Sequence, residues 1–190
     1  IVDDASTDGS ADIFAANYGG VLVLRPPERL GIASARNYGA RRARGAILAF
    51  SDAHVETPMG WFEPIQAALE SPRVGAAAPT ITVMGKPSAK GYGIRWKDAV
   101  LNIEWLAQRD TQPYPVPMVS ACFMAVRRNL FEHLNGFDEG LLVRGNCDSE
   151  FCIRLWTLGH ECWLVPSVEV VHLFRTSYHY AVDQAKILHN

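Results

Sequence analysis

Residues 46–56 read AILAFSDAHVE, and this stretch decides the fold that we expect for the chain. A short apolar run bounded by polar residues is typical of a buried strand in an α/β sheet. Asp52 and His54 follow the run and point to the same side of an extended segment, because they are two residues apart. Open α/β sheets bind ligands at the carboxyl ends of their strands. The stretch therefore predicts part of a metal site; the alternative is that Asp52 caps a turn and His54 is an ordinary loop histidine.

The composition is that of a globular protein. The chain has 190 residues, of which 48% are hydrophobic and 20% charged, and its net charge is −2. These values predict one domain over residues 1–190, with no electrostatic attraction to nucleic acid and no indication of membrane association. Four cysteines without a C-x-x-C pair or zinc-type spacing indicate reduced thiols and a cytoplasmic protein; the alternative is a disulfide. Because residues 1–4 read like the end of a strand, we expect a preceding strand and helix to be missing from this fragment.

Strands and helices are expected to alternate along the first part of the chain. Short apolar runs predict strands at 1–4, 21–24 and 46–50, with helices at 11–17 and 32–44 between them. Such alternation with short connections favours a parallel, Rossmann-like sheet. The remaining expectations are helices at 59–70, 127–134, 148–158 and 176–190, strands at 75–83, 118–126, 162–166 and 168–172, and a long excursion over the active-site face at 85–117.

Charged residues near the start of the chain are candidates for nucleotide binding. Asp3 and Asp4 follow the first expected strand, where carboxylates can accept hydrogen bonds from a base or a ribose. Arg29 and Arg36 flank the start of the helix at 32–44, where cations and main-chain amides can meet a diphosphate. The alternatives are a turn-forming acid pair and a solvated basic helix face.

Two candidates come from the second half of the chain. His172 would complete, with Asp52 and His54, a set of carboxylate and imidazole ligands that suits Mn²⁺ or a similar ion. The alternative is that His172 packs in the core. Asp148 begins an expected helix and is a candidate general base toward an acceptor hydroxyl, unless it only caps that helix.

Read together, these stretches resemble the nucleotide-sugar-dependent glycosyltransferases of the GT-A fold. Both family 2 and the polypeptide N-acetylgalactosaminyltransferases are similar, the latter through a D-x-H form of the metal motif and a V-x-H-x-F-R segment. The similar segments, in chain order, are VDDASTDGS at 2–10, RLGIASARNYGA at 29–40, FSDAHVE at 50–56, FDE at 137–139, EFCIRLW at 150–156 and VHLFR at 171–175.

The resemblance implies an α/β GT-A (Rossmann-like) three-layer sandwich with a mixed, mostly parallel sheet. It implies the metal-dependent transfer of a sugar from a nucleotide-sugar, with UDP as the expected nucleotide, to a hydroxyl acceptor on a glycan, lipid or peptide. The metal would be Mn²⁺ or Mg²⁺, bound against the diphosphate. The residues that would bind the donor and the metal are Asp3, Asp4 and Arg29 for the nucleotide and Asp52, His54 and His172 for the ion.

Departures from the polypeptide transferases bear on the stereochemistry. Where those enzymes have W-G-G-E-N, this chain has RGNCD at 144–148, so Cys147 replaces their glutamate and Asp148 their asparagine. Inverting family-2 enzymes have an aspartate there that acts as the base. We therefore expect an inverting reaction with Asp148 as the base and Glu150 shaping the acceptor site. The alternatives are a retaining enzyme like the polypeptide transferases and a degenerate domain that binds a nucleotide-sugar without turnover.

Overall fold

The computed structural model describes residues 1–99, 101–143 and 145–175, and it divides into two compact units. Among the described residues, unit 1 contains residues 1–44 and 136–147, and unit 2 contains residues 45–135 and 148–175. The helix expected at 176–190 lies outside the described residues. Among the residues that are described, no helix combines the length and the apolar character needed to cross a membrane.

Unit 1 contains α1 (Ser10–Asn17) and α2 (Ile32–Ala40). The strands expected at 1–4 and 21–24 were predicted too long, because only Val2 and Leu24 form a bridge, which is parallel. The apolar run at 21–24 is largely exposed, so it lacks the buried neighbours that would extend a ladder. The helix expected at 32–44 also ends early, and a turn follows Ala40.

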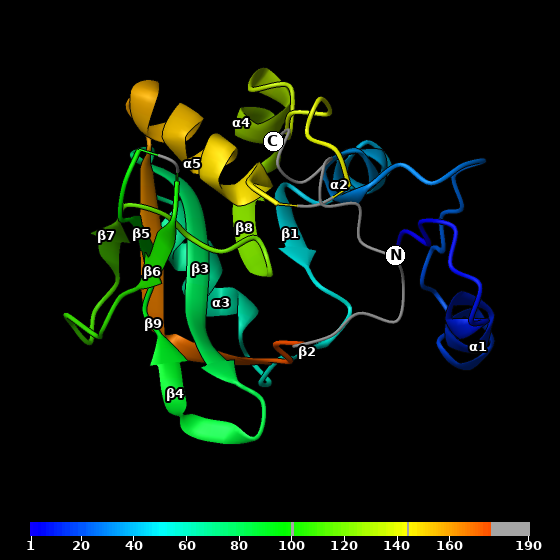
Figure 1. The fold of residues 1–190 in the computed structure, drawn as a ribbon, viewed down its shortest axis with the longest axis horizontal. Helices are drawn as coiled ribbons and strands as arrows, with labels where there is room; N and C mark the ends of the chain where they lie inside the picture. Colours follow the sequence, from blue (N-terminus) through cyan, green and yellow to red (C-terminus); the bar gives the residue numbers. More distant parts are fainter. Residues whose placement is uncertain (100, 144, 176–190) are drawn as a thin grey trace. The chain divides into compact units, whose positions relative to one another are not determined.

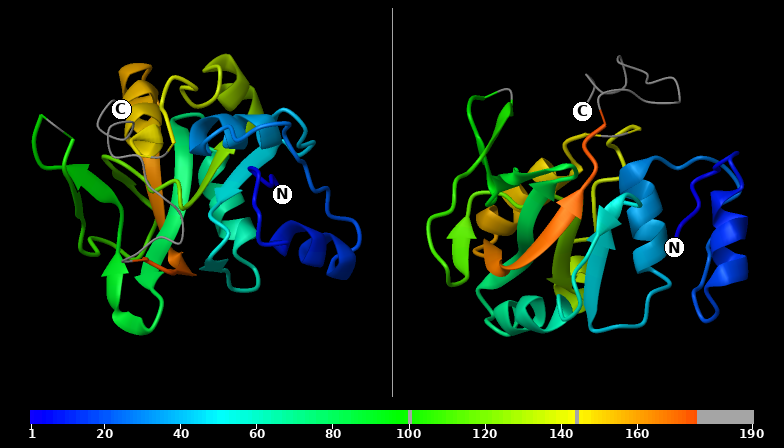
Figure 2. Two further views of the ribbon diagram at one scale, coloured as in Figure 1. Left: turned by 45° about the vertical axis from the view of Figure 1, so that its right-hand side comes forward. Right: turned by 90° about the horizontal axis from the view of Figure 1, so that it is seen from below.

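Unit 2 is built on one sheet, shown in Figures 1 and 2. Its main strands, in their order across the sheet, are β1 (Ile47–Ser51), β8 (Phe123–Arg127), β3 (Val74–Val83), β9 (Glu161–His172) and β2 (Val55–Glu56). Two short strands extend it: β4 (Lys86–Gly91) pairs with β3, and β7 (Tyr114–Val116) pairs with β9. A separate two-stranded hairpin consists of β5 (Ile94–Trp96) and β6 (Ile103–Trp105).

Three helices accompany this sheet, and they bury its two faces. They are α3 (Phe62–Leu69), α4 (Arg128–His133) and α5 (Cys147–Thr157). Helix α3 packs on one face of β3 and β9, and α5 lies on the other (Figure 1). The α/β three-layer arrangement of the expected fold class is therefore confirmed for this unit.

The expectation of a mostly parallel sheet was wrong. Among the strand pairs of the described residues, β3 with β9 is parallel, whereas β1–β8, β8–β3, β2–β9, β3–β4 and β7–β9 are antiparallel. The alternation of strands and helices near the start suggested consecutive parallel neighbours, but β8 inserts between β1 and β3 and runs against both. A run of apolar residues reports burial, not strand direction.

Other boundaries also differ from the expectations. The excursion at 85–117 contains the four short strands β4 to β7, and the strand expected at 118–126 begins only at Phe123. The two strands expected at 162–166 and 168–172 are one continuous strand, β9, whose register against β3 shifts between Pro79 and Thr80. A local irregularity of this kind breaks the sequence pattern without ending the strand.

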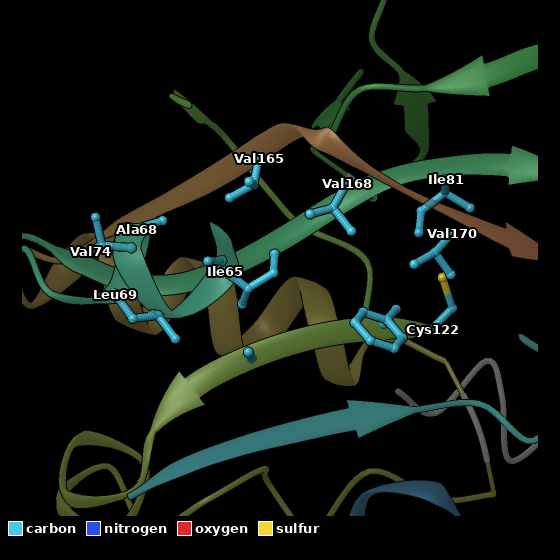
Figure 3. Close-up of a cluster of buried hydrophobic side chains, with 12 residues drawn as sticks. Ile65, Ala68, Leu69, Val74, Ile81, Cys122, Val165, Val168 and Val170 are labelled. Atoms are coloured by element: carbon cyan, nitrogen blue, oxygen red, sulfur yellow. The ribbon is translucent and has the colours of Figure 1, made fainter. Parts of the chain in front are cut away.

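The hydrophobic core of unit 2 lies between α3 and the sheet (Figure 3). Ile65 and Leu69 of α3 are fully buried, because their spacing places them on one face of the helix. They pack against apolar side chains of β3, β8 and β9; those labelled in Figure 3 include Val74, Ile81, Val165, Val168 and Val170. All four cysteines of the chain are buried, and none forms a disulfide.

Candidate metal centre and neighbouring site residues

The three predicted metal ligands meet at one end of the sheet of unit 2. Asp52 follows β1, and its main-chain N–H donates to the carbonyl of Cys122 at 2.9 Å. His172 is the last residue of β9 and is paired with Val55 of β2. The carbonyl of His54 accepts a hydrogen bond from the main chain that follows His172. Main-chain pairing therefore fixes where each of the three side chains starts.

The side chains of this triad converge. One ligand atom from each of Asp52, His54 and His172 lies within 4.8 Å of the others. His172 Nε2 and Asp52 Oδ2 are 3.3 Å apart. His172 is buried, at 6% exposure, and the other two residues are half-buried. The structure thus brings together the three residues that the sequence singled out.

The electrostatics of the triad favour a neutral imidazole at His54. Burial lowers the pKa of His54; the Asp52 carboxylate acts in the opposite direction, and His172 and Arg175 act in the same direction as burial. Neutral imidazole is the form that binds a metal, so a lowered pKa favours binding at neutral pH. One carboxylate and two imidazoles suit Mn²⁺ and similar divalent ions. The residues present therefore fit the implied metal.

Asp148 lies at the start of α5 and contacts two main-chain amides. Its Oδ2 accepts a hydrogen bond from Ala121 N at 3.3 Å, and its Oδ1 accepts one from Ser149 N at 3.1 Å. The carboxylate is half-buried and ties the segment before β8 to the first turn of α5. Asp148 is the second residue of α5 and thus an acid of its first turn, and these two contacts hold the carboxylate in a fixed position.

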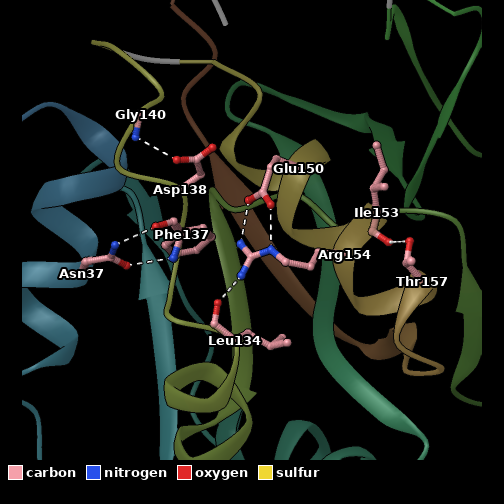
Figure 4. Close-up of polar contacts among 9 residues, drawn as sticks. All are labelled: Asn37, Leu134, Phe137, Asp138, Gly140, Glu150, Ile153, Arg154 and Thr157. Atoms are coloured by element: carbon pink, nitrogen blue, oxygen red, sulfur yellow. Dashed lines mark hydrogen bonds and ion pairs between the residues drawn. The ribbon is translucent and has the colours of Figure 1, made fainter.

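Glu150 forms a two-pronged ion pair with Arg154 one turn further along α5 (Figure 4). Arg154 Nε and Nη2 each donate to the Glu150 carboxylate at 2.7 Å, and another nitrogen of Arg154 donates to the carbonyl of Leu134. This geometry links α5 to the end of α4, because the planar guanidinium spans both. A role of Glu150 toward an acceptor remains a prediction.

In unit 1, Asp4 shapes the segment that leads into α2. Its Oδ1 accepts a hydrogen bond from Leu30 N at 2.7 Å, and its Oδ2 accepts one from Gly31 N at 3.0 Å. Arg29, one of the expected nucleotide contacts, precedes these two residues and is exposed. Asp4 therefore organises the loop that carries Arg29. A direct contact of either residue with a nucleotide remains a prediction.

Asp3 has a similar local role. Its Oδ1 accepts a hydrogen bond from Ser6 N at 2.9 Å, and its Oδ2 lies 3.5 Å from Arg25 Nε. The hydrogen bonds from Ser6, with a smaller effect of Arg25, lower the pKa of Asp3. The side chain thus stays ionised over a wide pH range, as an acceptor for a nucleoside hydroxyl or amide would need to be.

Arg36 and Cys147, which both drew attention in the sequence, meet in unit 1. Arg36 Nη1 donates to Cys147 Sγ at 3.3 Å, and its guanidinium lies 5.8 Å from the centre of the Phe137 ring. Arg36 was considered for a diphosphate contact. Its contacts with Cys147 and Phe137 do not test that prediction.

One buried polar residue, Asn37, was not singled out in the sequence. Its Oδ1 accepts a hydrogen bond from Phe137 N at 2.9 Å, and its Nδ2 donates to Phe137 O at 2.8 Å (Figure 4). The same amide nitrogen donates to Glu139 Oε1 at 2.9 Å. The available signal was an asparagine inside an alanine-rich helix, where such a residue needs a partner other than the helix itself.

Comparison with known sequences indicates the family. The model of the family described as "Glycosyl transferase family 2" matches residues 1–134. Polypeptide N-acetylgalactosaminyltransferase 13 of Rattus norvegicus is 30% identical over 95% of this chain and 36% of its own length. The probable polypeptide N-acetylgalactosaminyltransferase 8 of Homo sapiens is 29% identical over 96% of this chain and 32% of its own length. The chain thus spans about a third of the length of these curated relatives.

Comparison with solved structures supports the fold. The crystal structure of GalNAc-T7 with UDP, GalNAc and Mn²⁺ superposes with a TM-score of 0.78 at 24% identity, over 92% of this chain and 37% of that one. A mannosyltransferase from Pyrobaculum calidifontis in complex with GDP-Man and Mn²⁺ gives a TM-score of 0.60 at 20% identity, over 92% of this chain and 47% of that one. At these identities the likeness concerns the fold alone.

Proposed function

Because the chain belongs to glycosyl transferase family 2, we propose that it binds a nucleotide-sugar with the help of a divalent metal ion and transfers the sugar to a hydroxyl acceptor. The observation that carries this proposal is the cluster of Asp52, His54 and His172, in which the first and last residues are 120 positions apart. One carboxylate and two imidazoles, which are common ligands of divalent metal ions, thus converge from distant segments of the chain.

In this proposal Asp52, His54 and His172 hold the ion. When bound, it offsets negative charge on the departing nucleotide diphosphate. Two imidazoles among three ligands favour Mn²⁺ over Mg²⁺, because Mg²⁺ prefers oxygen ligands. The two structural neighbours contain Mn²⁺ with UDP and with GDP-Man, respectively, which supports Mn²⁺ and a nucleotide-sugar donor.

We assign nucleotide binding to Asp3, Asp4 and Arg29. Each carboxylate has about four lone-pair sites, so the main-chain contacts of Asp3 and Asp4 leave capacity for a base or ribose. Asp3→Asn and Arg29→Met are the useful variants, because Asp4 also holds the loop before α2. Calorimetry with UDP and Mn²⁺ should give weaker binding for both variants, and native affinity in both would remove these residues from the site.

For the stereochemistry, the relatives favour a retaining reaction. The similar curated proteins are polypeptide N-acetylgalactosaminyltransferases, and their names indicate a peptide hydroxyl as the acceptor. Those enzymes have asparagine where this chain has Asp148. In a retaining reaction Asp148 therefore has a structural role, which agrees with its contacts to Ala121 N and Ser149 N.

An inverting reaction with Asp148 as the base is the second candidate. It is favoured by the carboxylate itself, which two main-chain amides hold at the start of α5. Asp148→Asn separates the candidates, because an amide cannot accept the acceptor proton. Loss of transfer with UDP binding intact would support Asp148 as base, whereas full turnover would support the retaining reaction.

The experiment that tests the proposed function is a screen of UDP- and GDP-sugars with Mn²⁺. Donor binding by calorimetry, donor hydrolysis, and the anomeric configuration of any product by NMR are measured together. We expect binding that requires Mn²⁺ and is lost in Asp52→Ala. Binding without hydrolysis or transfer would indicate a nucleotide-sugar-binding domain, and no metal dependence would refute the proposal.

A further inference from the structure

No described residue gives the ring of His172 the second hydrogen bond that usually orients a metal-binding histidine. Its Nε2 faces Asp52, but its Nδ1 is buried and has no hydrogen-bond partner among the described residues. In most metal sites the second ring nitrogen donates to a carboxylate, a carbonyl or water, which fixes the ring. Here the main chain is fixed, since His172 O accepts from Met84 N at 2.9 Å, but the ring needs another restraint.

Aromatic packing supplies that restraint. The Phe174 ring lies edge-on to the His172 ring, with centroids 4.3 Å apart and planes at 74°. Trp105, at the end of β6, lies edge-on to Phe174 at 6.0 Å and 88°. Such edge-to-face arrangements are favourable because the positive ring edge meets the negative ring face. Phe174 itself is 41% exposed, and its ring contacts both His172 and Trp105.

Trp105 in turn lies against the main chain of Gly91, the last residue of β4. A Cβ at Gly91 would lie 2.8 Å from Cδ2 and Cζ3 of Trp105, and closer still to Cε3. Gly91 does not have a positive φ, so its backbone conformation is open to alanine. The nearest obstacle to a side chain at this position is therefore the indole ring of Trp105.

We propose that Trp105 and Phe174 are positioning residues of the metal centre, which hold the His172 imidazole by packing in place of a hydrogen bond. Gly91 belongs to this arrangement because it leaves the space that the indole occupies. The β5–β6 hairpin, which offers no metal ligand, then sets the affinity of the metal site. This inference rests on the proposed metal site at Asp52, His54 and His172.

The test measures Mn²⁺ binding without donor or acceptor, by the electron paramagnetic resonance signal of free Mn²⁺. Gly91→Ala and Trp105→Ala should weaken binding about tenfold or more, the usual effect of disturbing a residue that orients a ligand. Trp105→Phe keeps an aromatic edge and should restore affinity close to native. Gly19→Ala is the matched control, because a Cβ there meets nothing within 4 Å and the residue has no positive φ.

A second readout follows the ring itself. Nitrogen-15 NMR of the histidine side chains, without metal, should show a shifted or broadened His172 signal in Gly91→Ala and a native signal in Gly19→Ala. His172→Ala identifies the signal. Circular dichroism establishes that each variant is folded; if Gly91→Ala is not, the comparison of Trp105→Ala with Trp105→Phe decides.

The outcomes separate this inference from the proposed function. If His172→Ala loses Mn²⁺ while Gly91→Ala and Trp105→Ala bind it like the native chain, the metal site stands and the positioning role is refuted. If His172→Ala binds Mn²⁺ like the native chain, the metal site itself is refuted. Weakened binding in Gly91→Ala and Trp105→Ala, with recovery in Trp105→Phe, supports both.

Discussion

Replacing Asn37 by alanine should destabilise unit 1 strongly, although the residue lies in neither predicted binding site. The substitution removes three hydrogen bonds, two to the main chain of Phe137 and one to Glu139. Asn37 is 4% exposed and Phe137 1% exposed, so water does not easily take over the two bonds to Phe137. At about 1 kcal/mol for each bond, the free energy of unfolding should fall by about 3 kcal/mol.

The assay combines urea unfolding, followed by circular dichroism, with hydrogen exchange of the Phe137 amide. A loss of about 3 kcal/mol corresponds to roughly hundredfold faster exchange if local opening limits it. Asn37→Leu fills the volume without the bonds and should be destabilised similarly, which separates hydrogen bonding from packing. Asn17→Ala is the control, because exposed Asn17 donates a single bond, to Ile13 O. If Asn37→Ala loses no more stability than Asn17→Ala, the reasoning is wrong.

Three further predictions concern pH, packing and thiol chemistry. The pKa of Glu139 is lowered, chiefly by the hydrogen bond from Asn37. The stability that this carboxylate contributes is therefore present above its unfolded pKa and is lost as pH falls through its folded pKa. Urea titrations from about pH 6 to about pH 3 should show a smaller loss of stability in Asn37→Ala than in the native chain. Gly75→Ala should cost about 1 to 3 kcal/mol in thermal unfolding, because the new Cβ would lie 2.6 Å from Leu155 Cδ2; an unchanged midpoint would contradict this. Burial raises the pKa of the Cys152 thiol, so a disulfide reagent should label it only at the rate of unfolding, and fast labelling of the folded chain would contradict its placement.

The sequence predicted the elements of the fold better than their pairing. The apolar run before Asp52 and the face formed by Ile65 and Leu69 lie in elements close to those expected, because burial leaves a periodic pattern. Strand direction leaves no such pattern, so the antiparallel insertion of β8 was not foreseen. The strands between 85 and 117 are mostly short and include Gly91 and Pro115, which obscure any period.

The candidate metal centre could be predicted because its ligands follow strands and sit in recognisable motifs. Its surroundings could not, because they depend on contacts between distant segments. The sequence near His172 does not indicate that Trp105 lies beside Phe174, or that the indole of Trp105 packs against Gly91. Side-chain packing of this kind is decided by the tertiary structure and leaves no local pattern.

The parallel pairing of β3 with β9 has a consequence for the order of folding. Asp52 emerges early in the chain, but His172 comes at the end of β9, where it pairs with Val83 at the far end of β3. Parallel pairing of distant segments is slow, because a long loop must lose conformational entropy before any stabilising contact between the strands forms. It follows that the metal centre is completed late, after β9 has aligned along β3 over its whole length. Uptake of Mn²⁺ during refolding would then mark the moment at which the sheet is finished.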